Sequence, residues 1–62
     1  MNDEDQWTLD AMEKYGGSFV KALGAAAQRA DRDNLEKIKR AFPEYWSEYA
    51  VMGEKMKSES GE

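Results

Sequence analysis

Helix-breaking residues at two places divide this chain of 62 residues into short segments. Gly16 and Gly17 can end a helix by taking the left-handed backbone conformation that glycine adopts without steric cost. Pro43 biases Phe42 away from helical backbone and is well suited to the first turn of a new helix. No segment alternates with the period of a strand. The sequence therefore predicts an all-α fold, a compact bundle of three to four short helices.

These breaks place the helices in one domain that spans residues 6–57. The residues before it, 1–5, are expected to form a disordered acidic leader, and residues 58–62 a disordered tail, because chain ends are poorly ordered unless something holds them. The helices are expected at about 6–15, 18–30, 34–42 and 43–57.

Short polar side chains before the expected helices are candidate N-caps, since their oxygen atoms can accept a free backbone N–H. Asp3 or Asp5 is expected to cap the first helix and Ser18 the second. Asp33, followed by Glu36, resembles a capping box for the third helix.

Apolar side chains recur at helical spacing in the second, third and fourth segments, which predicts one buried face on each helix. Gly24 lies inside the second helix, where glycine costs roughly 1 kcal/mol relative to alanine, so a packing contact is expected there. The expected core consists of Phe19, Leu23, Leu35, Ile38, Phe42, Tyr45 and Tyr49.

A domain this small buries little apolar surface, and association with another chain is a usual way to add more. The sequence has no cysteine and no histidine, so it can form no disulfide and no zinc site built from those ligands. We therefore expect a protein partner or a homodimer, with a monomer left open.

Charge is distributed unevenly along the chain, whose formal net charge is −4. Residues 1–13 carry five acids and no base, and residues 44–62 carry five glutamates and two lysines, whereas residues 28–40 carry five bases and three acids. Affinity for phosphate rises with the number of cations engaged, so this balance disfavours nucleic acid as a partner. The acidic start is the reverse of a signal peptide and no apolar run approaches membrane-spanning length, so we expect a cytoplasmic protein without a membrane partner.

The residue types that most often carry catalysis are missing. Without histidine or cysteine, the commonest general base and the cysteine nucleophile are excluded, and the serines have no base at a recognisable spacing. We predict no catalytic, cofactor-binding or metal-ligating residue, and therefore a binding protein and not an enzyme.

The aromatic segment 42–49 is the strongest indication of an interaction surface. Trp46 lies about 100° round the helix from Tyr45. Ala50 and Gly53 lie beside it, forming a groove of small residues. Tryptophan is frequent at interface hot spots, and small neighbours would admit a partner helix. The predicted partner-binding residues are therefore Trp46, Ala50, Gly53 and Val51, the last expected to be exposed on the polar side of the helix. The same groove could pair two copies; a monomer with Trp46 folded against the first helix remains the alternative.

The competing function is that of a helix-turn-helix-like DNA-binding regulator. Its reading helix would be the third, with Lys37, Lys39 and Arg40 facing outward toward DNA. The acidic balance of the chain, and the lack of Asn, Gln or Ser on that outward face, weigh against this function.

Two runs, MEKYGGSFVKAL at 12–23 and AFPEYW at 41–46, are joined by a short segment rich in alanine and aspartate. Together they are similar to small uncharacterised helical accessory proteins encoded by phages and prophages, over about residues 7–52. The resemblance implies a phage protein that acts in a bacterial host on a host protein complex, for example as an inhibitor of a defence system such as CRISPR. No functional residue comes with the resemblance.

Overall fold

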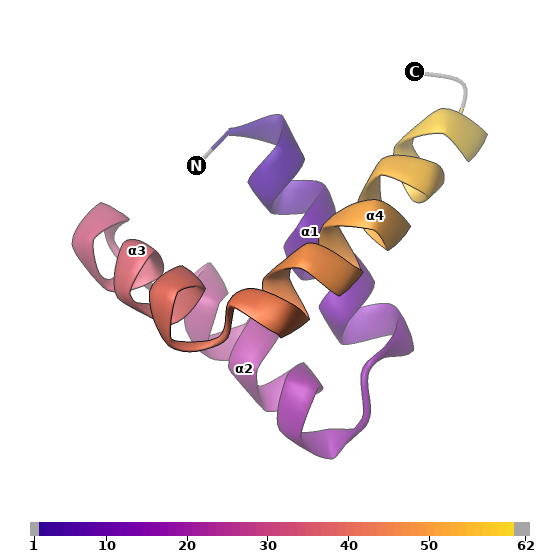
Figure 1. The fold of residues 1–62 in the computed structure, drawn as a ribbon. Coiled ribbons are helices and arrows are strands. Elements are labelled where there is room, and N and C mark those ends of the chain that lie inside the picture. The colour runs from indigo at the N-terminus through magenta and orange to yellow at the C-terminus, as the bar shows by residue number, and fades with distance from the viewer. Residues whose placement is uncertain (1, 61–62) are drawn as a thin grey trace.

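The computed structural model describes residues 2–60, which form the four helices α1 (Asp3–Tyr15), α2 (Ser18–Gln28), α3 (Arg32–Ala41) and α4 (Pro43–Glu59). Helix α1 lies between α2 and α4 and carries much of the buried core (Figure 1). Packing is extensive between α1 and both α4 and α2, whereas α3 makes few contacts and lies at the edge. The predicted all-α class is confirmed.

The first helix begins earlier than its sequence indicates. Its N-cap is Asn2, whose side-chain oxygen accepts a hydrogen bond from the backbone N–H of Asp5 at 2.8 Å, so neither Asp3 nor Asp5 is the cap. Both aspartates lie in the first turn, where the helix dipole favours negative charge. The boundary expected for the leader 1–5 is therefore corrected to Asp3, while Met1 lies outside the described residues.

The connection between α1 and α2 also differs from the expected glycine turn. Gly16 has φ −75° and ψ 157°, which is extended and not left-handed backbone. Glycine is required here for space, because a Cβ atom would lie 2.6 Å from Val20 Cγ1. Gly17, and not Ser18, is the N-cap of α2, and no side chain caps that helix end.

Two further helix ends are set by Asp31 and Pro43. Asp31 caps α3 by accepting the backbone N–H of Asn34 at 2.8 Å, so the predicted cap at Asp33 is corrected by two residues. Pro43 is the first residue of α4, as predicted. Helix α4 continues to Glu59, two residues past its expected end.

The expected tail therefore begins within α4. Its last two residues, 61 and 62, lie outside the described part of the chain.

Two glycines allow α2 and α4 to approach α1 closely. A Cβ atom on Gly24 of α2 would lie 3.1 Å from Met12 Cβ, which confirms the packing contact expected there. A Cβ atom on Gly53 of α4 would lie 2.6 Å from the Trp7 carbonyl oxygen and 2.9 Å from the Thr8 nitrogen. Backbone of α4 is thus in direct contact with backbone of α1.

The buried apolar core differs in part from the expected one. Of the expected residues, Leu35 and Tyr49 are buried, while Leu23, Ile38 and Phe42 are partly buried. Phe19 and Tyr45, also expected in the core, are exposed. The buried apolar side chains are Leu9, Ala11, Met12, Val20, Ala27, Leu35 and Tyr49.

The packing of α2 explains why Val20 is buried in the core, where Phe19 was expected. This helix turns the face of Val20, Gly24 and Ala27 toward α1, and these residues recur at i, i+4 and i+7. Phe19 lies about 100° away from that face. The smaller face is buried because it permits the shorter distance between helices.

Polar groups in the interior have partners. The Thr8 hydroxyl donates to the Glu4 carbonyl oxygen at 2.9 Å, and Lys39 Nζ donates to Asp5 Oδ2 at 3.0 Å. Across the described residues, no buried side-chain nitrogen or oxygen lacks a hydrogen-bond partner.

Over residues 2–60, no helix has both the length and the apolar character needed to cross a membrane.

Gly53→Ala is expected to lower the free energy of unfolding by about 1–3 kcal/mol, because the added methyl group overlaps the Trp7 carbonyl and pushes α4 from α1. Gly17→Ala is the comparison: a Cβ atom there meets nothing within 4 Å, so only the poorer N-cap of α2 should register, at about 0.5 kcal/mol. Urea denaturation followed by circular dichroism measures both. Equal costs for the two substitutions would contradict the close approach at Gly53.

Candidate protein-binding surface

Three aromatic side chains from separate segments meet on the surface near the junction of α3 and α4. Phe19 comes from α2, Phe42 from the link between α3 and α4, and Tyr45 from the first turn of α4. The ring centroids are 5.7 Å apart for Phe19 and Phe42, 5.9 Å for Phe19 and Tyr45, and 6.1 Å for Phe42 and Tyr45. We call these three residues the aromatic cluster.

Two of the three rings of the aromatic cluster are exposed to solvent. Phe19 is 53% exposed and Tyr45 38% exposed, and Phe42 is partly buried. Full burial of a side chain such as phenylalanine is worth about 1.5–3 kcal/mol, so leaving these rings at the surface forgoes stability that a small domain could use. Contiguous exposed apolar groups on a soluble chain mark interaction sites more often than scattered ones do.

Local sequence explains why the rings gather here. Phe19 is turned away from α1 because its neighbour Val20 is buried against that helix. Pro43 starts α4 and holds Phe42 at φ −130° and ψ 58°, outside helical geometry. The chain therefore turns at Phe42, and its ring contacts both the α2 ring and the α4 ring.

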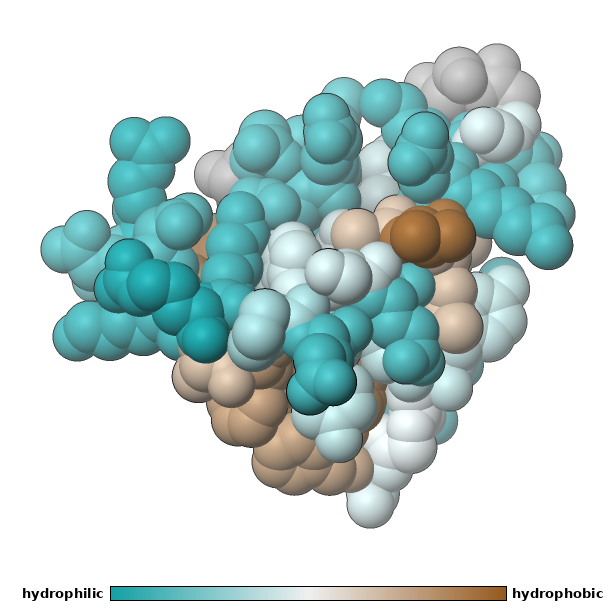
Figure 2. Space-filling model, in the orientation of Figure 1, coloured by the Kyte–Doolittle hydropathy of each residue, from teal (hydrophilic) through white to brown (hydrophobic). Residues whose placement is uncertain are grey.

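Small exposed residues continue this apolar surface along α2 and α3. Ala22 and Ala26 follow Phe19 at i+3 and i+7, and Ala41 precedes Phe42; all three alanines are exposed. Figure 2 shows a brown apolar region in the lower part of this face, bordered by hydrophilic side chains where α3 projects.

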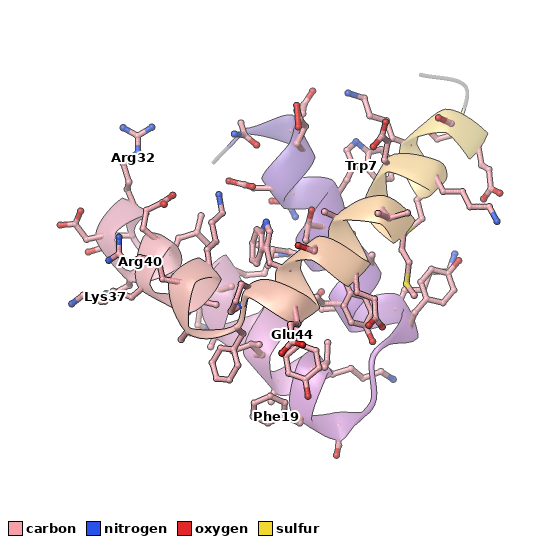
Figure 3. All side chains as sticks on the ribbon, in the orientation of Figure 1. Trp7, Phe19, Arg32, Lys37, Arg40 and Glu44 are labelled. Atoms are coloured by element: carbon pink, nitrogen blue, oxygen red, sulfur yellow. The ribbon has the colours of Figure 1, made fainter. Side chains whose placement is uncertain are left out.

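Exposed cations lie on the outward side of α3. Arg32, Lys37 and Arg40 are exposed and project from that helix, whereas Phe19 lies at the bottom of the same view (Figure 3). Segment 18–42 carries six bases and three acids, so it is positive within a chain of net charge −4. The ion pairs found among residues 2–60 both involve Lys39, and so the three exposed cations have no carboxylate partner there.

Lys39 was predicted to face outward, and this prediction is wrong. Its Nζ lies 3.0 Å from Asp5 Oδ2, 3.6 Å from Glu36 Oε2 and 5.1 Å from the centroid of the Trp46 ring. The side chain thus joins α3 to α1 and α4. Of the three cations predicted to contact DNA, Lys37 and Arg40 are exposed and Lys39 is engaged in the fold.

The four predicted partner-binding residues do not share one surface. Gly53 is buried against α1, so the groove expected beside Trp46 is filled by this chain's own first helix. Trp46 is partly buried against the core, and Ala50 is partly buried at the side of α4 that faces α1. Val51 alone among the four is exposed, at 70%. The prediction of a helix-binding groove at Gly53 is therefore corrected.

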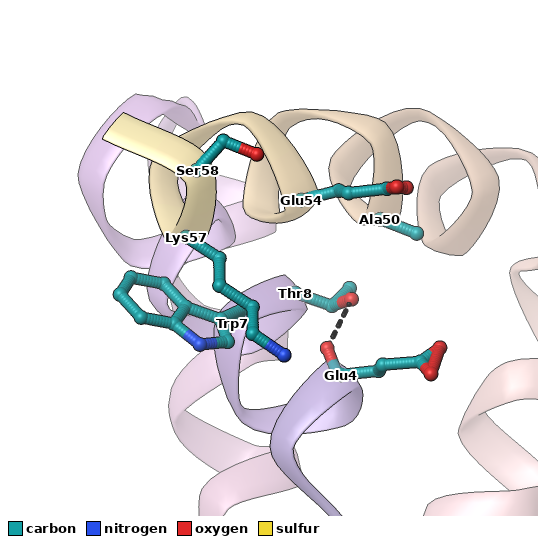
Figure 4. Close-up of a pocket in the computed structure, with 7 residues that line it drawn as sticks. All are labelled: Glu4, Trp7, Thr8, Ala50, Glu54, Lys57 and Ser58. Atoms are coloured by element: carbon teal, nitrogen blue, oxygen red, sulfur yellow. Dashed lines mark hydrogen bonds between the residues drawn. The ribbon is translucent and has the colours of Figure 1, made fainter. Parts of the chain in front are cut away.

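An open groove of about 360 Å³ lies between the start of α1 and the end of α4 (Figure 4). Its charged groups are the carboxylates of Glu4 and Glu54 and the ammonium of Lys57. The Thr8 hydroxyl at its base is already bonded to the Glu4 carbonyl. Within residues 2–60, no three side chains from His, Cys, Asp and Glu are grouped so as to hold a metal ion. The remaining lining residues are Trp7, Ala50 and Ser58.

Sequence reasoning missed the aromatic cluster as a surface, although a signal was present. The second helix carries two apolar stripes, one beginning at Phe19 and the other at Val20. Only one stripe can face α1. The glycine at position 24 lies in the stripe of Val20, and this marked it as the closely packed side.

Comparisons with known proteins return no match, whether with family models, with curated proteins or with solved structures. The candidate surface is therefore defined by its exposure, ring contacts and neighbouring charges.

A double-mutant cycle on Lys39 and Asp5 tests the tie between α3 and α1. Lys39→Met and Asp5→Asn should each destabilise the fold, and the coupling between them should be about 0.5–1 kcal/mol, since the pair is only partly buried. Lys37→Met is the control and should leave stability nearly unchanged, because that lysine is exposed. Urea denaturation at low and high salt measures the coupling; strictly additive effects would show that the pair contributes nothing.

Proposed function

We propose that this chain is a small, non-enzymatic protein-binding module that contacts its partner through the aromatic cluster. The observation that carries this proposal is the meeting of three rings from separate segments at the surface, with Phe19 53% and Tyr45 38% exposed. Aromatic residues are enriched at the centres of protein interfaces, where they lose their remaining contact with water. Burial of these rings by a partner would recover the stability that the isolated fold forgoes.

The proposed partner is a protein complex of a bacterial host, with the chain encoded by a phage. Inhibition of a defence system such as CRISPR is the sharper form of this proposal. Its support is the resemblance to phage accessory proteins, and the two runs that carry this resemblance also carry the aromatic cluster: Phe19 lies in the first, and Phe42 and Tyr45 lie in the second.

The alternative, a DNA-binding regulator, has less support. Lys39 is engaged with Asp5 and Trp46, which leaves Lys37 and Arg40 of the predicted reading set. Asp33 is exposed on the same helix and would oppose phosphate. A face with so few free cations is a weak basis for binding a duplex.

Phe19→Ser and Tyr45→Ser are expected to abolish capture of the host partner. Tagged chains would be incubated with bacterial lysate, and the captured proteins compared by quantitative mass spectrometry. Val51→Ser is the matched control, because it also removes an exposed apolar side chain, yet from a position outside the aromatic cluster. Circular dichroism would verify that all three variants remain helical. Equal capture by the cluster variants and the native chain would reject the aromatic cluster as the contact surface.

A gel-shift titration with duplex DNA over a range of salt concentrations tests the regulator. We expect no saturable binding, because the chain is acidic and Lys39 is not free. Saturable binding that falls steeply with salt, and that is lost in Lys37→Gln and Arg40→Gln, would favour the regulator over the protein-binding module.

A further inference from the structure

We propose that the aromatic cluster and the exposed cations of α3 together form a docking site for an acidic amphipathic helix of a partner protein. The inference rests on the proposed protein-binding function and goes beyond it by naming the chemistry of the partner. Three features of the surface carry it: the helical spacing of the apolar strip, the exposed cations of α3, and the arrangement of the rings.

The shape of the strip suits a helix. Phe19, Ala22 and Ala26 recur at i, i+3 and i+7 along one side of α2, over a length of about 10 Å. The alanines are short, so the backbone of an incoming helix can approach α2 closely beside the paired rings of Phe19 and Phe42. An exposed apolar strip at helical spacing can accept the apolar stripe of an amphipathic helix.

The exposed charges of α3 favour an acidic partner. Lys37 and Arg40 project from α3, with Arg32 nearer its start, and none of the three pairs with a carboxylate among the described residues. In the view of Figure 3, Glu44, at the start of α4, lies nearer to Phe19 than these cations do, so the positive side of the surface is the side toward α3. Segment 18–42 has six bases against three acids, although the whole chain is acidic. Carboxylates along the polar edge of a docked helix would complement these cations, accelerating encounter and fixing its orientation.

The same charges argue against a second copy of this chain as the occupant. Pairing through a two-fold axis places the same patch on both sides of the interface, so two copies of the net positive segment 18–42 would face each other. Such like-charge juxtaposition is unfavourable.

The ring arrangement argues against single-stranded nucleic acid. Proteins that bind it offer ring faces on which successive bases stack. Here the interplanar angles are 66° for Phe19 and Phe42, 49° for Phe19 and Tyr45, and 39° for Phe42 and Tyr45. The rings are tilted relative to one another, so they form no parallel series on which successive bases could stack.

The test uses the full chain, labelled with ¹⁵N, and two synthetic peptides of about 18 residues, which span about 27 Å as helices. Both carry leucine and phenylalanine at helical spacing on one face. The first has glutamate along the edges of that face, and its twin has glutamine in place of every glutamate. Glutamate and glutamine have similar helix propensities, so the twins differ mainly in charge.

We expect the acidic peptide to shift the amide resonances of Phe19, Ala22, Ala26, Ala41 and Tyr45. It should bind on the order of tenfold more tightly than the glutamine twin at low salt, as two to three exposed ion pairs allow. At roughly 1 M salt, where the Debye length falls to about 3 Å, the two affinities should converge.

Two sets of variants separate the apolar contribution from the charge. Phe19→Ser should weaken both peptides, and Val51→Ser neither. The double variant Lys37→Glu and Arg40→Glu should lose the preference for the acidic peptide while still binding its twin. Lys14→Glu with Lys55→Glu changes the net charge equally at exposed positions outside α3, and it should keep the preference.

The inference would be overturned if the two peptides bind with equal affinity, if the amide shifts occur at other residues, or if about 1 mM peptide causes no shift. It would also be overturned if the Lys37→Glu and Arg40→Glu variant keeps its preference for the acidic peptide, or if a single-stranded oligonucleotide binds more tightly than the peptide. Shifts at the aromatic cluster on dilution of the chain alone would assign the surface to a second copy instead. If these results occur while Phe19→Ser still abolishes capture of the host partner, the proposed function stands and only the acidic helix is rejected. If Phe19→Ser leaves that capture unchanged, the proposed function fails as well.

Discussion

The close approach of α2 and α4 to α1 is the contact on which the rest of the structure depends. Gly53 lies so near the backbone of Trp7 and Thr8 that a methyl group would overlap the Trp7 carbonyl, and Gly24 lies against Met12 on another side of α1. Dispersion attraction acts only at short range, so helices that touch through glycine gain contacts that longer side chains would prevent. One central helix can thereby supply a core to a chain of only 62 residues.

The exposed aromatic cluster is a consequence of that packing. Because α2 presents Val20 and Gly24 to α1, Phe19 is left at the side of the helix, about 100° away. Pro43 then places Phe42 at a bend, and the two rings meet Tyr45 at the surface. The rings are held by contacts with one another and remain available to a partner.

The charges of α3 divide between folding and the surface. Lys39 lies on the side toward α1, where Asp5 and the Trp46 ring engage it, and this matters for a helix that otherwise makes few contacts. Lys37 and Arg40 lie on the outward side. Helix α3 therefore contributes both an ion pair within the fold and exposed positive charge at the surface. Lys39, one of the cations predicted to bind DNA, forms the ion pair.

The sequence by itself determined the helical class, the breaks near Gly16 and Pro43 and the positive middle segment, because these depend on backbone preferences and composition that act locally. Both stripes of α2 are apolar, and the tertiary structure selected the one that allows the shorter distance to α1; in the sequence, only Gly24 indicated that choice. The tertiary structure likewise decided that the space beside Gly53 is occupied by the backbone of α1, in the place where a partner helix was expected. Helical spacing places Trp46, Ala50 and Gly53 along one side of α4, but it does not say which neighbour covers them; that depends on where a helix some forty residues earlier in the chain comes to lie.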